Sequence, residues 1–221
     1  MIVQQLLEKS QTKIRKIGLS SASHQLFLKT VNAFMLFKIL RGVTLQKVDP
    51  AFLDYPSHFK PMFLSEQMMR HYARDPVNEM PESFIEESLA KGDQCFGIFD
   101  GAVLASYGWY SRKPTHIDPP ELFLHFSPSY VYMYKGFTHH EYRGQRLHAI
   151  GMNLALKHYL EKGYKGLVSY VESSNFDSLK SIYRLGYLNV GSIYLIRLFG
   201  NYQSFASKGC DAFELALKTL V

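Results

Sequence analysis

Apolar and polar residues recur along this chain with two periods, one typical of helices and one typical of strands. Residues 2–17 repeat apolar side chains at three-to-four spacing, which predicts an amphipathic helix, and the serines that follow offer caps for a second helix over 22–33. Residues 34–48 are rich in apolar and β-branched side chains and favour a strand, with a turn or bulge at Arg41-Gly42. The chain therefore begins with two short helices ahead of its first strand.

The next part of the chain is predicted to be helical and then to form a β-hairpin. Two strand-like runs flank the turn Asp100-Gly101, which is a strong hairpin signal. A polar, proline-rich stretch follows that is longer than most connections, as functional loops often are. The expected elements are a helix over 58–73 that is irregular near Pro61, a helix over 81–91, strands over 94–99 and 102–110, and a loop over 111–128.

The second half of the chain reads as strand, helix, strand, helix, strand, strand. The predicted ranges are strand 130–137, helix 145–162, strand 165–171, helix 176–185, strand 188–199, a polar loop over 200–209 and a last strand over 213–220. A strand-helix-strand crossover implies a parallel pair. We expect an α/β (α+β) fold: a mixed, mostly antiparallel twisted sheet with a central parallel pair, flanked by helices, plus an N-terminal helical extension over 1–33.

Composition indicates one buried core, and the two cysteines are typical of a protein in a reducing compartment. The chain has 221 residues, of which 47% are hydrophobic, enough for one domain over 34–221 with its extension. Cys95 and Cys210 match neither a metal site nor a disulfide framework, so no metal is expected. The N-terminus lacks the apolar core and cleavage site of a secretory signal, which indicates a cytoplasmic protein.

Positive charge is concentrated at the N-terminus. Residues 1–48 hold eight lysines and arginines against one glutamate, a net +7, while the whole chain carries +6. This basic region suits peripheral contact with an acidic membrane surface or an acidic carrier protein, but a solvated helix face is the simpler explanation. Nucleic acid is not expected as a partner, because the region lacks a recognition motif.

A site for an anion is predicted where the strand over 130–137 passes through a polar turn into the next helix. The turn is centred on Arg143-Gly144 and opens directly into an apolar-periodic helix. The start of a helix presents unpaired N–H groups and the positive end of the helix dipole, which together bind phosphate.

Around this turn the chain resembles the GNAT superfamily of N-acetyltransferases. The segment His140-Glu141-Tyr142-Arg143-Gly144 resembles the family's acyl-CoA motif, and the segments 175–179 and 182–187 (NFDSL, IYRLGY) resemble its "N…S…Y…LGF" region. The likeness spans about residues 36–220. It implies a GNAT-like acyltransferase domain that uses acetyl-CoA or another acyl-CoA as co-substrate.

The resemblance also implies which residues hold coenzyme A. The N–H groups of residues 143–148 would cradle the pyrophosphate, and the strand over 130–137 would part from its parallel neighbour to admit the pantetheine arm. The chain departs from the family pattern because Arg146 and His148 replace two small residues, so they clasp, reshape or close the site. The implied contacts are Phe137, Thr138, His139, Arg143, Gly144, Gln145, Arg146, Leu147, His148, Asn175 and Tyr183.

Acyl transfer to an amine needs an acid for the departing thiolate and a base for the amine. By the resemblance, Tyr183 is the general acid, although a core aromatic would fit its position on a helix. A base comes from the cluster His139, His140 and Glu141, or from Glu172 or Glu121; the cluster is equally consistent with a polar loop. Asn175 is either a ligand contact or a helix cap.

The resulting hypothesis is an acyl-CoA-dependent N-acyltransferase, by default an N-acetyltransferase, acting on a small amine or amino acid. Two alternatives stay open: a catalytically inactive GNAT-fold protein that binds a ligand or partner, and a long-chain N-acyltransferase that uses acyl-CoA or an acyl carrier protein. A homodimer is compatible with the sequence. The acceptor is not determined by the fold.

Overall fold

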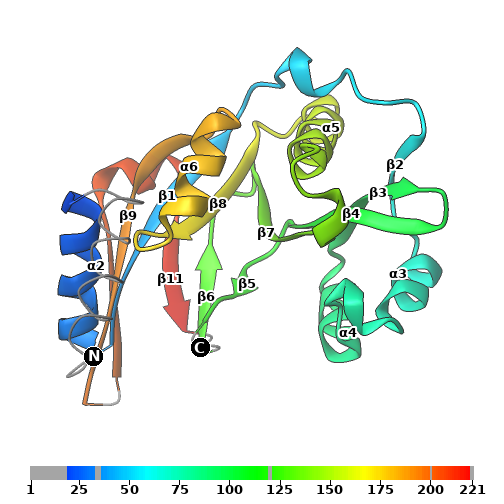
Figure 1. Cartoon of the computed structure of the whole chain (residues 1–221). Helices are drawn as coiled ribbons and strands as arrows, with labels where there is room; N and C mark the ends of the chain where they lie inside the picture. The colour runs from blue at the N-terminus through cyan, green and yellow to red at the C-terminus, as the bar shows by residue number, and fades with distance from the viewer. Residues whose placement is uncertain (1–18, 33–35, 119–120, 200, 220–221) are drawn as a thin grey trace, which may run out of the picture.

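A large mixed sheet forms the centre of the structure (Figure 1). The computed structural model describes residues 19–32, 36–118, 121–199 and 201–219. The sheet has eight strands in the order β10-β9-β1-β8-β7-β4-β3-β2. Their bounds are β1 Leu36–Leu45, β2 Phe59–Phe63, β3 Gln94–Asp100, β4 Val103–Ser111, β7 Val131–Thr138, β8 Leu167–Glu172, β9 Leu188–Leu198 and β10 Asn201–Ala206.

Helices and a small second sheet cover the two faces of the large sheet. The α-helices are α2 Leu19–Asn32, α3 Glu66–Ala73, α4 Glu82–Lys91, α5 Leu147–Glu161 and α6 Phe176–Arg184. The 3-10 helices are η1 Pro50–Phe52, η2 Pro76–Asn78, η3 His140–Tyr142 and η4 Lys208–Phe213. The second sheet has the order β11-β6-β5, from Ala216–Thr219, Leu122–His125 and Thr115–His116.

Three apolar clusters show which elements share a face. Side chains of α5 and α6 pack with Val43, Val131 and Leu167. Side chains of α3 and α4 pack with Tyr107 and Trp109 on the opposite face, and the small sheet packs beside them against β1, β7, β8 and β9. In Figure 1, α5 and α6 accordingly lie on one side of the sheet, away from α3, α4 and β5, β6 and β11.

The expected fold class is confirmed. Strands β7 and β8 are parallel, and the other paired strands of the described sheets are antiparallel. The connection between β7 and β8 runs through α5, as the crossover predicts. The predicted bulge in the first strand is also present, between Gly42 and Val43.

Three predicted elements are wrong. Residues 59–63 of the predicted helix 58–73 form the edge strand β2, and the helix begins only at Glu66, where the Ser65 side chain accepts a hydrogen bond from Met68 N. Pro61 is tolerated in β2 because an edge strand needs hydrogen bonds on one side only. The expected loop 111–128 contains β5 and β6, and the expected loop 200–209 contains β10.

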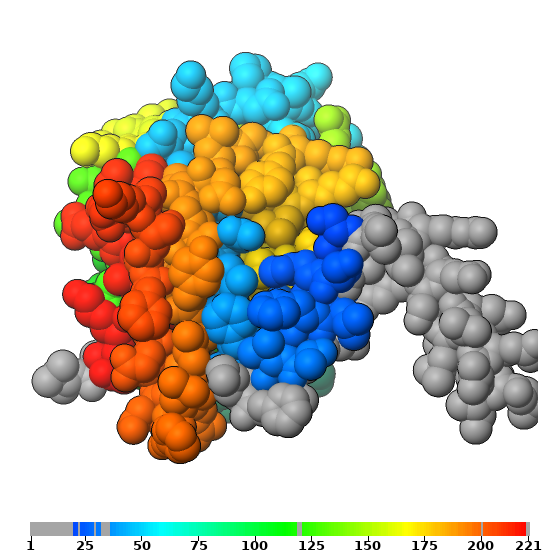
Figure 2. All heavy atoms as spheres, turned by 90° about the vertical axis from the view of Figure 1, so that its left-hand side faces the viewer, coloured from blue at the N-terminus to red at the C-terminus, as the bar shows by residue number. Residues whose placement is uncertain are grey.

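Helix α2 packs against the large sheet beside α6. Gln25 Nε2 donates to the carbonyl of Ser174 at 3.0 Å, the His24 ring lies 3.0 Å from Ser173 Oγ, and Leu28 is buried. Figure 2 shows α2 on the same face as β1 and the β9–β10 hairpin. The helix predicted over 2–17 lies outside the described residues, and the boundary at residue 33 stays a prediction. No helix in the described ranges is long and apolar enough to cross a membrane.

Candidate active site

Strands β7 and β8 part in the middle of the sheet. They are paired at Val131↔Leu167 and Tyr132↔Val168 only. Beyond these pairs β7 continues beside β4 to Thr138, and β8 continues beside β1 to Glu172. The β8-facing backbone groups of β7 beyond Met133 are thus released from the ladder, and released backbone groups need other partners.

A β-bulge marks the point of separation. Trp109 pairs with Lys135 and Tyr110 pairs with Met133, so Tyr134 is the extra residue on β7. A bulge bends its strand and increases the local twist. Ser169 Oγ on β8 donates to the Met133 carbonyl at 2.7 Å, which occupies the first acceptor freed by the separation.

The turn between β7 and α5 exposes a run of backbone N–H groups. The first helical bond of α5 is Ile150 N to Arg146 O, and the N–H groups of residues 144–149 donate no hydrogen bond within the described structure. No acidic side chain occupies the first turn of the helix. The exposed Arg143 donates weakly to the Thr138 carbonyl at 3.4 Å. This end of α5 is therefore electropositive, with free N–H donors and no carboxylate in its first turn.

Arg146 has a backbone conformation that favours glycine. Its φ of 60° lies in the left-handed region, and it is the residue immediately before α5. Its guanidinium lies 5.8 Å from the centre of the Phe52 ring in η1. A cation over an aromatic face offsets part of the cost of the left-handed backbone. The side chain is exposed and remains next to the free N–H groups.

His148 turns toward the sheet rather than toward the anion site. A Cβ atom added at Gly136 of β7 would overlap the His148 ring, so the imidazole lies directly on this glycine. Gly136 is paired with Gly108 of β4, which leaves the sheet without side chains on this patch. Burial lowers the pKa of His148 to about 4, so the ring is neutral at pH 7 and adds no charge for phosphate.

Tyr183 is a partly exposed residue of α6, with 43% of its surface accessible, so the core reading is wrong. Asn189 Nδ2 in β9 donates to its hydroxyl oxygen at 3.3 Å. Asn175 is a helix cap, since its side chain accepts from Ser178 N at 3.1 Å. The cap does not exclude a ligand contact, because the Asn175 side chain also has an amide group with two donors.

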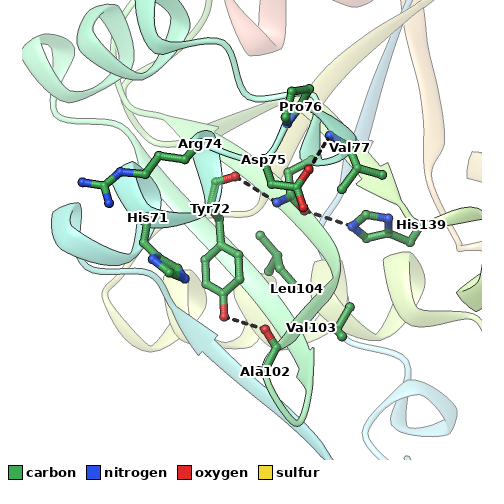
Figure 3. A pocket seen from close by; sticks show the side chains of 11 residues that line it. His71, Tyr72, Arg74, Asp75, Pro76, Val77, Ala102, Val103, Leu104 and His139 are labelled. Atoms are coloured by element: carbon green, nitrogen blue, oxygen red, sulfur yellow. Dashed lines mark hydrogen bonds between the residues drawn. The ribbon is translucent and has the colours of Figure 1, made fainter.

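His139 lies at the end of β7 and lines a cavity of about 550 Å³ between α3, η2 and the β3–β4 turn (Figure 3). Asn78 Nδ2 donates to the Tyr72 carbonyl, so Asn78 Oδ1 faces His139 Nε2 at 2.9 Å. Nε2 therefore carries the proton in a neutral ring, and Nδ1 holds the free lone pair. Glu141 is exposed in η3.

The structure does not bring the predicted acid and bases together. No hydrogen bond or ring contact joins Tyr183 to His139 or Glu141 in the described residues. Tyr183 is an exposed residue of α6, which packs with α5 on one face of the sheet, whereas His139 faces η2 on the opposite side. His139 is also five residues beyond the bulge residue Tyr134, so its backbone lies roughly 16 Å from that of Tyr134 along an extended strand. Their catalytic roles, and that of Glu141, stay predictions.

A group of polar residues that the sequence did not single out lies beside the bulge. Tyr134 Oη donates to Asp93 Oδ2 at 2.8 Å and lies 3.1 Å from Ser88 Oγ, while Lys91 Nζ is 3.0 Å from the same carboxylate oxygen. The Asp93 side chain is fully buried. A bulge is set by pairing between distant strands, so nothing local in the sequence marks Tyr134 or its neighbour Lys135.

The other proposed bases have structural partners or lie apart. Glu172 Oε1 is 3.1 Å from Lys38 Nζ, and the exposed Glu121 immediately precedes β6. Among the described residues, no group of three His, Cys, Asp or Glu side chains could hold a metal ion.

The sequence matches no family model and no curated protein. Solved structures do match, among them an acetyltransferase from the GNAT family of Colwellia psychrerythraea, at 14% identity and a TM-score of 0.51. The chain has the GNAT fold. The match covers 79% of this chain and 57% of the Colwellia chain.

Two further structures share the GNAT fold with this chain. One, from Novosphingobium aromaticivorans, is assigned to the GNAT family of acetyltransferases, with a TM-score of 0.52, 15% identity and coverage of 72% of this chain and 62% of that one. The other is a functionally unknown conserved protein from Staphylococcus epidermidis, with a TM-score of 0.51, 11% identity and coverage of 77% and 65%. The chain thus spans about three fifths of the length of these structures, and the likeness concerns the fold.

Proposed function

We propose that this chain is an acyl-CoA-dependent N-acyltransferase, with acetyl as the default acyl group. The observation that carries the proposal is the parting of β7 and β8 at Tyr134, on a strand that leads into the free N–H groups of residues 144–149. One end of this arrangement suits pyrophosphate, and the released edges of the strands suit an extended amide-containing arm. Coenzyme A carries both groups on one molecule.

The chain's own residues divide the binding of the donor between two regions. The N–H groups of residues 144–149, with the guanidinium groups of Arg143 and Arg146, would hold the phosphates. The β8-facing backbone groups of Gly136 and Thr138 would hydrogen-bond to the pantetheine amides, which includes the predicted contact at Thr138. The backbone of Phe137, also a predicted contact, faces β4 instead, and its carbonyl accepts from Ser106 Oγ at 2.8 Å. His148 contributes a neutral wall over Gly136 instead of a phosphate contact.

The proposed chemistry is direct transfer. The lone pair of a neutral acceptor amine attacks the thioester carbonyl, a C–N bond forms, and the C–S bond breaks. The amine releases its proton to a base or to water, and the thiolate takes the Tyr183 hydroxyl proton. Because Asn189 donates to the Tyr183 oxygen, the phenolic proton is left free for the thiolate. A phenol and a thiol have reference pKa values of about 10 and about 8.5, so this transfer needs no large pKa shift.

One observation favours the inactive alternative. The His148 ring covers the strand next to the proposed pantetheine path, where the family pattern has a small residue. If this ring narrows the path, the protein would bind coenzyme A without turnover or would not bind coenzyme A at all. The long-chain variant depends on space beyond the thioester.

Release of free thiol from acetyl-CoA and from longer acyl-CoAs, against a panel of amines, tests the proposal. We expect acceptor-dependent thiol release, and a fall of about 10²–10⁴ in turnover for Tyr183→Phe with unchanged donor affinity. The matched control is Tyr194→Phe, because Tyr194 is a similarly exposed tyrosine on β9. Equal turnover of wild type and Tyr183→Phe would contradict the assignment of Tyr183 as the general acid. If no acyl-CoA binds, the inactive alternative is supported instead.

A further inference from the structure

Lys135 is a partly buried cation at the point where the strands part. It follows the bulge residue Tyr134 and is paired with Trp109, so its side chain lies on the face of α3 and α4. Its Nζ is 4.4 Å from the centre of the Phe84 ring and donates to the Glu79 carbonyl. No carboxylate of the described residues lies within ion-pair distance of it.

The lack of a carboxylate partner has an energetic consequence. Removing an ammonium from water is costly unless an anion or several acceptors replace the water. Burial lowers the pKa of Lys135 from its ordinary value, and the Glu79 carboxylate opposes this shift although it forms no ion pair with Nζ. An anionic group on a ligand would satisfy the remaining donors of Lys135 with charge-assisted hydrogen bonds.

Opposite charge lies across the separation, beyond β8. Lys38 on β1 is shared by two carboxylates: Glu172 at the end of β8, at 3.1 Å, and Asp118, at 2.7 Å. One ammonium between two carboxylates leaves an excess negative charge. The carboxylates are also the exposed partners, with 44% and 85% of their side chains accessible against 17% for Lys38. This side therefore attracts a cation.

The other charged groups near the bulge are already paired. Lys91 and Asp93 form their own ion pair, and Tyr134 donates to the same carboxylate. The stacked rings of Tyr132, Tyr134 and Tyr170 belong to the same face, where Tyr132 is buried beneath the small sheet. The free charge on this face is thus positive on β7 and negative at the end of β8.

We propose that this face binds an acceptor that carries both an amine and a carboxylate, that is, an amino acid. Lys135 binds the carboxylate, and Glu172 and Asp118 draw in the ammonium before it loses its proton. The inference rests on the proposed acyl transfer, whose donor approaches along the opposite face from the N-terminus of α5. It adds the class of acceptor to that function.

The test compares acceptors that differ only in the carboxylate: an amino acid, its carboxamide and the corresponding simple amine. We expect kcat/KM for the amino acid to exceed that for the carboxamide by about tenfold or more, because a hydrogen bond to a charged group is lost in the amide. Lys135→Met keeps the aliphatic stem over Phe84 and is expected to bring the ratio close to one. Its matched control is Lys157→Met, on the exposed side of α5, which is expected to keep the ratio of the wild type.

A binding measurement separates this inference from the proposed function. Calorimetry with the amino acid and its carboxamide, with CoA present and absent, does not require turnover. Lys135-dependent binding of the amino acid without thiol release would overturn the transfer reaction and keep the acceptor class. Two results would overturn the acceptor class and keep the transfer reaction. One is turnover of amines and carboxamides as efficient as that of amino acids, and the other is an equal loss of kcat/KM for all acceptors in Lys135→Met. Neither binding nor turnover would overturn both.

Discussion

The contact between Gly136 and His148 lies where this sequence departs most clearly from the GNAT motif that it resembles, and Gly136→Ala tests it. The new methyl group would overlap His148 Cε1 and would lie 2.9 Å from Nε2 and 3.0 Å from Nδ1. The ring has little room to retreat, because the void beside it, between α5 and the sheet, measures only about 10 Å³. Either the start of α5 or the strand must move.

Overpacking of this kind costs about 1–3 kcal/mol in unfolding free energy. For a chain of this size, each kcal/mol lowers the melting temperature by about 2–4 °C. Urea unfolding of Gly136→Ala measures the loss, and calorimetry with CoA measures whether the displaced start of α5 weakens donor binding. The control is Gly151→Ala on α5, whose added Cβ meets only ordinary contacts at 3.6 Å or more. We expect that variant to be up to about 1 kcal/mol more stable than wild type, from helix propensity.

The double variant Gly136→Ala/His148→Ala decides whether the cause is this contact. Removing the ring makes space for the methyl group, so we expect the double variant to recover most of the stability lost on adding it, with a coupling of about 1–3 kcal/mol. Additive losses, or a Gly136→Ala protein as stable as wild type, would refute the reasoning.

Three further predictions follow from single contacts. Arg146→Gly relieves a left-handed backbone that costs about 1–2 kcal/mol and removes a cation–π contact worth about 0.5–1 kcal/mol. We therefore expect urea unfolding to show a slightly more stable protein, and calorimetry to show weaker CoA binding at low salt. His148 has a pKa of about 4 in the folded state and about 6.5 when unfolded, so the unfolded chain binds more protons between these pH values. The free energy of unfolding should therefore fall by about 3 kcal/mol as the pH drops from 6.5 to 4. Unfolding curves of His148→Gln should lack this part of the loss. Asn189→Asp replaces a donor to Tyr183 by an acceptor that captures the phenolic proton, so turnover should fall in the thiol assay while the Kd for CoA is unchanged.

Local patterns predicted the elements next to the donor site. The helix from Leu147, the strand before it and the turn between them follow from periodicity, and the parallel pair follows from the crossover connection. The cap at Asn175 was also readable from residue type.

Features that depend on pairing between strands far apart in the sequence could not be predicted from local patterns. Strand β2 looks helical because its apolar residues precede a genuine helix, and only its pairing with β3 makes it a strand. Strand β1 lies between β8 and β9, which are more than a hundred residues away in the sequence. The bulge at Tyr134 and the inward turn of His148 arise from the same kind of contact, so the sequence could flag His148 as unusual without giving its direction.

The most direct test of the donor site is backbone amide hydrogen exchange with and without CoA. Binding as proposed supplies acceptors to the free N–H groups of residues 144–149 and to the β8-facing N–H groups of Gly136 and Thr138 in the segment 134–138. We predict slower exchange in these two segments, which lie apart from the cavity lined by Asn78 and Val103. Unchanged exchange in both segments at saturating CoA, or protection confined to that cavity, would contradict the account.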